Sequence, residues 1–386
     1  MNDKIKISKS FTVGDWKSLR TNLLNTEEKW PDALDVFENR IYARFISPIE
    51  TIKSNGKNEG EGFTIALISV VLLEFIAAFE LGKIYKPTKE GLSPNQYFSG
   101  IKLLRSFIKD SVLFSYHLGS NSKIDKFYKN IRCGLVHEAR TMKNDVIISE
   151  NSRKNTKSDL FYFTENNETR LNRDLLLGTI NEHIIFYKSR ILTKDIILRN
   201  RFLIKMDEIS GLKHAWYFIY GSNLCEEQLK KRLHELNEIY LQKERCYLED
   251  YEFLYNKRSI DGSSKGNIKK SINVTVQGIV ILILENKLDE FIDKWEPGYE
   301  KEEIEVQSKL DNGKLLKFKA YTCKSNKISS APPTKEYVAK IIKGAKENEI
   351  SKEYIDEFFI YSDWKVRTFI KKYKIKVLDN QLILFK

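Results

Sequence analysis

One stretch of this chain, Trp216 to Glu226 (WYFIYGSNLCE), restricts most strongly what the residues around it can form. Its first five residues are aromatic or β-branched, as in a buried strand, and apolar residues recur at helical spacing after Glu226. Gly221, Ser222 and Asn223 connect these two segments. A strand that turns through glycine into a helix lets the main chain approach a ligand, and the free N–H groups of the helix start favour an anion. The stretch predicts a small anion-binding pocket, or alternatively an ordinary turn capped by Ser222 or Asn223.

The length of the chain predicts two domains. Its 386 residues exceed one typical domain, and each half is long enough to bury a core of its own. We expect residues 1–205 to form the first domain, and residues 206–386 to form the second together with a C-terminal extension. A hydrophobic content of 41% with 12% aromatic residues excludes a disordered protein. The net charge of +12 is spread over both halves, so it allows nucleic-acid binding without requiring it.

The first domain is predicted to be mostly helical. Residues 14–46 have helical spacing with a break near Trp30, because Pro31 cannot continue a helix. An apolar helix is expected from residue 63 to about residue 85, with further helices near residues 95–114, 124–136 and 171–192. Residues 145–148 and 160–164 are expected to pair as a hairpin.

The most apolar run, Phe63 to Phe79, is predicted to be a buried helix that does not span a membrane. Glu74 interrupts the run, and a carboxylate at mid-membrane would be costly. The N-terminus lacks the apolar core of a signal peptide. Four widely spaced cysteines without CxxC pairs argue against a zinc site or a disulfide framework and for a reducing compartment. We therefore expect a cytoplasmic protein with no membrane partner.

The segment Arg132-Cys-Gly-Leu-Val-His137 separates an arginine from a histidine by four residues. Histidine can transfer a proton near neutral pH, and arginine can hold a phosphate. In its helical context the spacing resembles that of HEPN-like domains. The resemblance implies that Arg132 and His137 could form an RNase site across a homodimer, although many members of that group are inactive binding modules. The alternative is a structural arginine and histidine in a helical interaction domain.

The second domain is predicted to be α+β. Strand-like runs cover residues 246–257 and 274–284, and Gly278 in the second run indicates a bulge or a close backbone approach. Shorter strands are expected at residues 303–306 and 315–321. The Pro332-Pro333 pair then sets an extended entry to a helix that carries Tyr337.

Glu296 is the candidate catalytic carboxyl of the second domain. It follows Trp295 and lies three residues before Tyr299. Desolvation by aromatic side chains raises the pKa of a carboxyl, so that it can act first as a base and then as an acid. The alternative is a solvated glutamate at the acidic end of a helix.

Four separated blocks of the second domain resemble the gamma-glutamylcyclotransferase family, in the order expected for it. The resemblance implies a small mixed α+β barrel and covers about residues 214–357. In this family an aliphatic residue and Asp precede the catalytic Glu, which is usually followed by Gly, whereas Pro297 takes that place here. The four blocks are Tyr220-Gly-Ser-Asn-Leu224, Val274-Thr-Val-Gln-Gly-Ile-Val280, Ile292-Asp-Lys-Trp-Glu296 and Ala331-Pro-Pro-Thr-Lys-Glu-Tyr337.

The resemblance implies an enzyme of transferase or lyase type that cyclises a gamma-glutamyl group to 5-oxoproline and releases an amine or amino acid. Glu296 would be its general acid and base, and neither a metal nor an organic cofactor would be needed. The residues implied in substrate binding are Tyr217, Phe218, Ile219, Tyr220, Gly221, Ser222, Asn223, Leu224, Tyr299 and Tyr337.

A second hypothesis assigns the activity to the helical domain. In it, the chain is a defence or toxin module whose helical domain acts on RNA or binds it, while the C-terminal domain senses a small ligand. An RNA partner and a homodimer through the helical domain belong to this alternative. The fusion of the two kinds of domain supports it by analogy alone.

Overall fold

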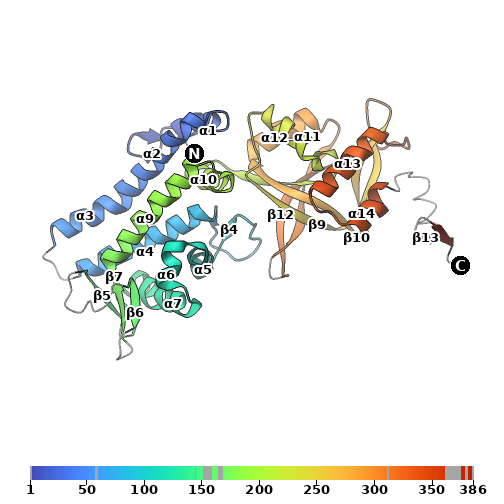
Figure 1. Cartoon of the computed structure of the whole chain (residues 1–386). Coiled ribbons are helices and arrows are strands. Elements are labelled where there is room, and N and C mark those ends of the chain that lie inside the picture. The colour runs from blue at the N-terminus through green and yellow to red at the C-terminus, as the bar shows by residue number, and fades with distance from the viewer. Residues whose placement is uncertain are drawn as a thin grey trace. The chain divides into compact units, whose positions relative to one another are not determined.

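The computed structural model describes residues 2–56, 60–143, 145–150, 159–163, 168–310, 313–360, 375–378 and 381–384. The chain divides into two compact units, which Figure 1 shows in cartoon form. The first unit contains Met1–Lys89 and Asn95–Leu212, and the second contains Glu90–Pro94 and Lys213–Lys386. The division falls later than the predicted residue 205, because helix α10 (Ile196–Ile209) continues past that position.

The first unit is mostly helical, as predicted. Pro31 lies in the first turn of a new helix that begins at Trp30, where the missing N–H of proline costs nothing. The helices of this unit that precede α10 are α1 (Val13–Leu23), α2 (Trp30–Ile41), α3 (Ser47–Ser54), α4 (Glu61–Glu80), α5 (Gly100–Asp110), α6 (Val112–Leu118), α7 (Asn121–Lys126), α8 (Gly134–Glu138) and α9 (Arg173–Leu192). One 3-10 turn, η1 (Glu27–Lys29), and two π-helical segments, η2 (Tyr42–Ile46) and η3 (Phe127–Cys133), connect some of them.

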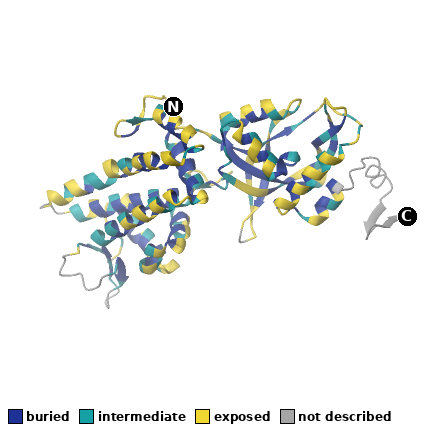
Figure 2. Cartoon of the chain, turned by 45° about the horizontal axis from the view of Figure 1, so that its top comes forward, coloured by how far each residue is buried: buried dark blue, intermediate teal, exposed yellow. Residues whose placement is uncertain are grey.

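Helix α4 lies at the centre of the core of the first unit. It packs against α5, α9 and α10. Figure 2 colours the chain by burial, with buried residues in dark blue. The ring of Phe79 lies 4.8 Å from that of Phe37 and 5.9 Å from that of Phe202. Among the helices of the described residues, only α4 is long and apolar enough to cross a membrane. Core helices pass the same test, and 56% of the most apolar 18-residue window of α4 is buried. This packing agrees with the predicted buried helix, although the helix ends at Glu80, before the predicted residue 85.

The hairpin predicted from residues 145–148 and 160–164 is wrong. The strand β5 (Val146–Ile148) and the strand β6 (Phe161–Phe163) both pair with a third strand, β7 (Thr169–Asn172), which lies between them. The β5–β7 pair is parallel and the β6–β7 pair is antiparallel. The prediction failed because β7 immediately precedes α9, and its residues were assigned partly to that helix. Asn172 ends the strand and caps the helix through its side chain.

Two further pairs of short strands belong to the N-terminal part of the chain. They are β1 (Lys6–Ser8) with β2 (Phe11–Thr12), which is antiparallel, and β3 (Ile84–Tyr85) with β4 (Gln96–Tyr97), which is parallel.

The second unit is α+β, as predicted, and is built on one five-stranded sheet. Its strands are β8 (His214–Ile219), β9 (Gln242–Arg258), β10 (Ser264–Leu284), β11 (Glu300–Lys309) and β12 (Leu315–Lys324). The sheet order is β10–β8–β12–β11–β9, and the sheet closes on itself because β9 also pairs with β10. All neighbours are antiparallel except β12 and β8.

The parallel seam between β8 and β12 is short. One backbone pair, Tyr217 with Tyr321, joins the two strands. Two side chains add hydrogen bonds across it: the Thr322 hydroxyl donates to the carbonyl oxygen of Phe218 at 3.1 Å, and the Tyr220 hydroxyl donates to the carbonyl oxygen of Cys323. Side chains therefore complete a closure that the backbone makes only in part.

On the other side of β8, Gly278 of β10 marks a close backbone approach, one of the two predicted alternatives. A Cβ atom at this position would lie 2.3 Å from the carbonyl oxygen of Ile219 and 2.8 Å from the ring of Phe218. The register of β10 against β9 shifts elsewhere, between Lys265 and Gly266 and between Lys270 and Thr275. Glycine is therefore needed here for space.

The helices of the second unit are short, and one of them lies directly against the candidate site loop. Gly344 of α13 lies so near Leu224 that a Cβ atom would be 2.1 to 2.6 Å from backbone atoms of Leu224 and Cys225. The helix predicted from the helical spacing after Glu226 ends at His234, and Asn237 adopts a positive φ of 52°. The helical segments are α11 (Glu226–His234), α12 (Glu285–Trp295), α13 (Lys335–Glu347), α14 (Lys352–Tyr354) and the π-helical η5 (Ile355–Ile360).

In the predicted C-terminal extension, β13 (Ile375–Leu378) and β14 (Gln381–Leu384) form an antiparallel pair. The other residues from 361 to 386 lie outside the described part of the chain.

Candidate active site

The loop after β8 has the predicted strand, glycine and helix order. The strand ends at Ile219, Gly221 follows Tyr220, and Ser222–Leu224 form one 3-10 turn (η4) before α11 begins. Among the described residues, the backbone N–H groups of Gly221 and Ser222 have no hydrogen-bond acceptor. A Cβ atom at Gly221 would meet only the hydroxyl of Tyr337, at 3.6 Å. The loop therefore exposes main-chain donors beside this hydroxyl group.

A cavity of about 30 Å³ lies against this loop. Since one water requires roughly 10 to 15 Å³, the cavity has room for about two waters before any side chain moves. Its walls come from β8, the loop, β10, the end of α12, β12 and α13. They are formed by Tyr217, Phe218, Ile219, Tyr220, Gly221, Ser222, Asn223, Gly266, Glu296, Tyr299, Cys323 and Tyr337.

The structure thus brings together all but one of the residues predicted from the sequence for this site. The exception is Leu224, which is fully buried and is not part of the cavity wall. Its carbonyl oxygen accepts a hydrogen bond from Asn348 Nδ2 at 2.8 Å, and α13 packs against it. Leu224 therefore anchors the loop from behind.

Glu296 faces the loop across the cavity. It follows the last residue of α12, and its side chain is 15% exposed. Asn223 Nδ2 donates to Glu296 Oε1 at 2.6 Å, and Arg232 Nη1 lies 3.7 Å from the same oxygen. The second carboxylate oxygen, Oε2, accepts no hydrogen bond from the described residues. One oxygen of the carboxylate is therefore fixed by the protein, and the other can meet a ligand.

The surroundings of Glu296 act on its pKa in opposite directions. Burial raises the pKa of the carboxyl above its ordinary value and is the largest effect. The positive charge of Arg232, the hydrogen bond from Asn223 and the charge of Lys257 each lower it, but the pKa stays raised. A carboxyl with a raised pKa can both accept and return a proton near neutral pH.

Residues of α11 fix the orientation of the Asn223 amide. Arg232 Nη1 donates to Asn223 Oδ1 at 2.6 Å, and Gln228 Nε2 donates to the same oxygen at 3.1 Å. Gln228 also donates to Ser222 Oγ at 3.1 Å, and the guanidinium of Arg232 lies 5.0 Å from the ring centre of Trp295. The amide oxygen of Asn223 therefore faces α11, so that its nitrogen faces Glu296.

Two tyrosines hold the backbone of Gly266 at the cavity wall. The Tyr299 hydroxyl donates to the carbonyl oxygen of Gly266 at 2.5 Å, and the N–H of Gly266 donates to the Tyr337 hydroxyl at 2.9 Å. Burial raises the pKa of Tyr337 to about 12 and that of Tyr299 well above its ordinary value. Both hydroxyl groups therefore stay protonated and neutral at physiological pH.

The sequence did not identify several residues of this site: Gly266, Cys323, Arg232 and Lys257. Burial raises the pKa of the Cys323 thiol to about 12, so this group is not a thiolate at neutral pH. Lys257 Nζ donates to the carbonyl oxygen of Pro297 at 2.8 Å and lies 4.8 Å from the ring centre of Tyr299. One signal for Arg232 was present, since Gln228 and Arg232 are four residues apart and share a helix face next to the loop.

No group of three or more His, Cys, Asp or Glu side chains that could hold a metal ion is found in the part of the chain that the structure describes.

The structure places the second predicted pair, Arg132 and His137, in the first unit. Arg132 lies near the end of the π-helical segment η3 and forms two hydrogen bonds with the carboxylate of Glu74, at 2.8 and 3.0 Å. The side chain of His137 is exposed on α8. The guanidinium that would hold a phosphate is thus paired with a carboxylate, and the RNase site stays a prediction.

Comparison with known proteins finds one family match within the second unit. Residues 275–358 match the model of the AIG2-like family, and the match contains Glu296, Tyr299 and Tyr337. This confirms the predicted resemblance of the C-terminal half to gamma-glutamylcyclotransferase-like proteins. The loop Tyr220–Asn223 lies outside the matched range.

Three solved structures are similar to part of the chain. A gamma-glutamyl cyclotransferase is 23% identical with a TM-score of 0.34, over 42% of this chain and 99% of that one. An uncharacterized human protein is 24% identical with a TM-score of 0.33, over 38% of this chain and 86% of that one. A yeast gamma-glutamyl cyclotransferase specific to glutathione is 13% identical with a TM-score of 0.27, over 42% and 96% respectively. No curated protein matches the chain.

Proposed function

We propose that the second unit cyclises a gamma-glutamyl group to 5-oxoproline and releases an amine or amino acid. The observation that carries the proposal is the position of Glu296 opposite the loop Tyr220–Asn223, across a partly open cavity, with Asn223 donating to it at 2.6 Å. The AIG2-like match over residues 275–358 supports the same class of reaction.

The loop supplies the binding groups of the proposed site. The N–H groups of Gly221 and Ser222, which have no acceptor among the described residues, would donate to the α-carboxylate or the γ-carbonyl oxygen of the substrate. The tyrosines Tyr299 and Tyr337 close the opposite wall through the backbone of Gly266. Donors fixed in a site that excludes water stabilise a developing oxyanion without reorganisation during the reaction.

The reaction moves one proton within one substrate molecule. Glu296 Oε2 takes a proton from the substrate's α-amine, whose nitrogen attacks the γ-carbonyl carbon and forms the new C–N bond of the ring. The tetrahedral intermediate then collapses, the bond from this carbon to the leaving nitrogen breaks, and Glu296 returns the proton to that nitrogen. Because nucleophile and electrophile belong to one molecule, holding the folded conformer supplies much of the rate.

The protein groups meet the needs of this proton transfer. Burial raises the pKa of Glu296, so that the carboxylate is basic enough to accept a proton and the acid strong enough to return it. The neighbouring tyrosines and Cys323 stay neutral because burial raises their pKa values as well. Glu296 is therefore the one cavity-lining side chain whose pKa suits an acid and base.

The direct test measures 5-oxoproline by mass spectrometry with purified full-length protein and three substrate classes: gamma-glutamyl amino acids, glutathione and gamma-glutamyl amines. We expect one class to be converted, and we expect Glu296→Gln to lower the rate by roughly 10²- to 10⁴-fold. The matched control is Glu290→Gln, which changes an exposed glutamate on the same helix and should leave the rate unchanged. Absence of product from all classes, or an equal rate in Glu296→Gln, would refute the proposal.

A further inference from the structure

A second cavity, of about 70 Å³, lies within the helical first unit. It is partly open to solvent and is lined by the end of α4, the junction of α5 and α6, the middle of α9 and one side chain of α10. Since one buried water requires roughly 10 to 15 Å³, the cavity has room for several waters or for one molecule of a few non-hydrogen atoms. Neither the AIG2-like match nor the proposed reaction involves this part of the chain.

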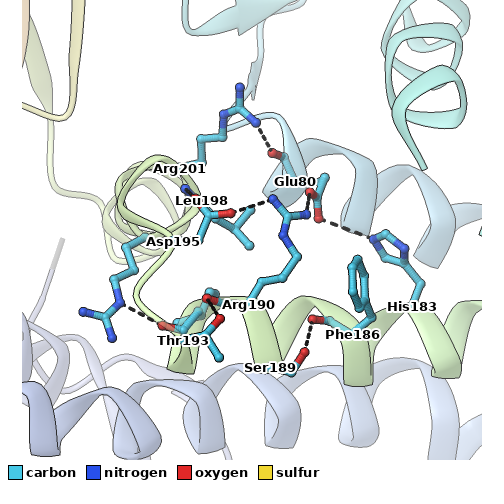
Figure 3. A network of polar contacts seen from close by, with 11 residues as sticks. Glu80, His183, Phe186, Ser189, Arg190, Thr193, Asp195, Leu198 and Arg201 are labelled. Carbon is cyan, nitrogen blue, oxygen red and sulfur yellow. Dashed lines mark hydrogen bonds and ion pairs between the residues drawn. The ribbon is translucent and has the colours of Figure 1, made fainter. Parts of the chain in front are cut away.

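Charged side chains on α4, α9 and α10 meet at this cavity (Figure 3). Arg190 lies between two carboxylates: its Nη1 donates to Glu80 Oε1 at 2.5 Å and its Nη2 donates to Asp195 Oδ2 at 2.7 Å. Arg201 Nη1 donates to the carbonyl oxygen of Glu80 at 3.0 Å. On the other side of Glu80, His183 Nε2 lies 3.4 Å from Oε2.

Three buried polar atoms of this cluster have no hydrogen-bond partner in the part of the chain that the structure describes. They are Glu80 Oε2 and both ring nitrogens of His183, although Glu80 Oε2 and His183 Nε2 lie 3.4 Å apart, within ion-pair distance. His183 is 3% exposed and its ring packs edge-on against Phe107. A buried polar atom without a partner destabilises the fold, and native proteins satisfy most such atoms. These three atoms are therefore candidates to form hydrogen bonds with a small molecule in the cavity.

The charges around the cavity select the kind of ligand. Two guanidinium groups, Arg190 and Arg201, and two carboxylates, Glu80 and Asp110, line it. A simple anion would face both carboxylates, and a simple cation would face both guanidinium groups. A molecule with one charge of each sign a few bonds apart can meet both kinds of wall at once.

We infer that this cavity binds a free α-amino acid with a small aliphatic side chain. Its carboxylate would accept hydrogen bonds from Arg201, which donates one other hydrogen bond among the described residues. Its ammonium group would donate to Glu80 Oε2 and to a ring nitrogen of His183. The side chain would lie against the apolar part of the wall, where Phe107 and Phe186 contribute their rings. The inference does not rest on the proposed cyclotransferase reaction.

L-Alanine and two fragments of it test the required charges. L-Alanine carries both charges, propionate keeps the carboxylate alone, and ethylammonium keeps the ammonium group alone. In isothermal titrations with the full-length protein, we expect alanine to bind about tenfold more tightly than propionate or ethylammonium. Each of these two molecules lacks one of the charge-assisted contacts of alanine. Equal affinity for all three, or no binding of alanine at millimolar concentrations, would overturn the inference.

Variants locate the bound alanine. Arg201→Gln should weaken alanine binding at least roughly tenfold, since a charged hydrogen-bond donor is removed. Arg105→Gln is the matched control, because Arg105 forms an exposed ion pair with Asp125 in the same unit. Glu296→Gln should leave alanine binding unchanged, whereas loss of binding in that variant would place the alanine in the second unit and overturn the inference.

A second substitution keeps the test decisive if Arg201→Gln fails to fold. His183→Phe removes two unpaired ring nitrogens and preserves a ring of similar size, so the variant should fold. In thermal unfolding, alanine should raise the melting temperature of the wild-type protein and of Arg105→Gln, but not that of His183→Phe. An equal rise in His183→Phe would refute a role of this cluster in binding.

Discussion

Gly278 offers a sharp test of how the closed sheet positions the candidate site. A Cβ atom at this position would lie 2.3 Å from the carbonyl oxygen of Ile219 and 2.8 Å from the ring of Phe218. Cβ atoms in proteins essentially never come closer than 3.0 Å to such atoms, so Gly278→Ala forces a displacement of at least 0.7 Å. The displaced strand is β8, which continues directly into the loop of Gly221 and Asn223.

The size of the effect follows from this displacement. Inserting one methyl group into a closely packed core costs about 1 to 3 kcal/mol of unfolding free energy. For a unit of this size that corresponds to a decrease in melting temperature of roughly 3 to 9 °C. A misplacement of this order at a reacting centre lowers an enzymatic rate by roughly ten- to a hundredfold. We therefore expect Gly278→Ala to lose both stability and the proposed activity.

Differential scanning calorimetry of the full-length protein, with 5-oxoproline release measured in parallel, checks this expectation. The control is Gly178→Ala in the interior of α9, where a Cβ atom would meet no atom within 4 Å. That substitution should stabilise the protein by about 0.5 to 1 kcal/mol, because alanine loses less entropy in a helix. The reasoning is refuted if the two alanine variants change the melting temperature in the same direction, or if Gly278→Ala is as stable as the wild type.

Three further substitutions test the charges and hydroxyl groups of the molecule. Arg232→Gln removes a positive charge that lowers the pKa of Glu296, so the acidic limb of the kcat/KM pH profile should move to higher pH; an unchanged limb would contradict this. Arg20→Met removes the ion-pair partner that lies 2.8 Å from the fully buried Asp207. It should lower the free energy of unfolding, measured with urea, by about 3 to 5 kcal/mol, and a decrease below about 1 kcal/mol would contradict this. Tyr337→Phe removes the hydroxyl that accepts a hydrogen bond from the buried N–H of Gly266. It should lower the proposed activity and lower the free energy of unfolding by about 1 to 3 kcal/mol, and full activity would show that the hydroxyl is dispensable.

Local sequence patterns sufficed for part of the fold and the candidate site. The aromatic strand, the glycine turn and the following helix are encoded within one continuous stretch, residues 214–234, and the structure has them in that order. Glu296, Tyr299 and Tyr337 were found through a resemblance whose blocks lie far apart in the sequence. The structure places these three side chains around the same cavity as Asn223.

The residues missed at the site depend on contacts between distant segments. Arg232 points at Asn223 because of the way α11 leaves the loop. Its spacing from Gln228 indicates a shared helix face but not the contact with Asn223. Gly266 falls between the strands predicted over residues 246–257 and 274–284, but β10 begins at Ser264 and brings the Gly266 backbone between two tyrosine hydroxyl groups. Cys323 reaches the cavity only because β12 pairs with β8 across the sheet. Sequence spacing does not encode such neighbours.

The failed hairpin of the first unit has a related cause. β5 and β6 are not partners of each other, since Thr169–Asn172 lies between them. A parallel pair such as β5 with β7 joins segments separated by a long connection, which alternation within each segment cannot reveal. Pairing partners are therefore the least predictable part of this unit.

Tyr220 has two roles, because its hydroxyl helps to close the seam between β8 and β12 and its side chain also borders the cavity. Evolution could not readily exchange this tyrosine to suit a different ligand, since the exchange would also weaken the closure of the ring. Diversification of ligand preference among relatives should therefore arise at wall positions that leave the seam intact. Gly221 and Ser222, whose main chain meets the ligand in the proposed reaction, constrain backbone shape more than side-chain identity.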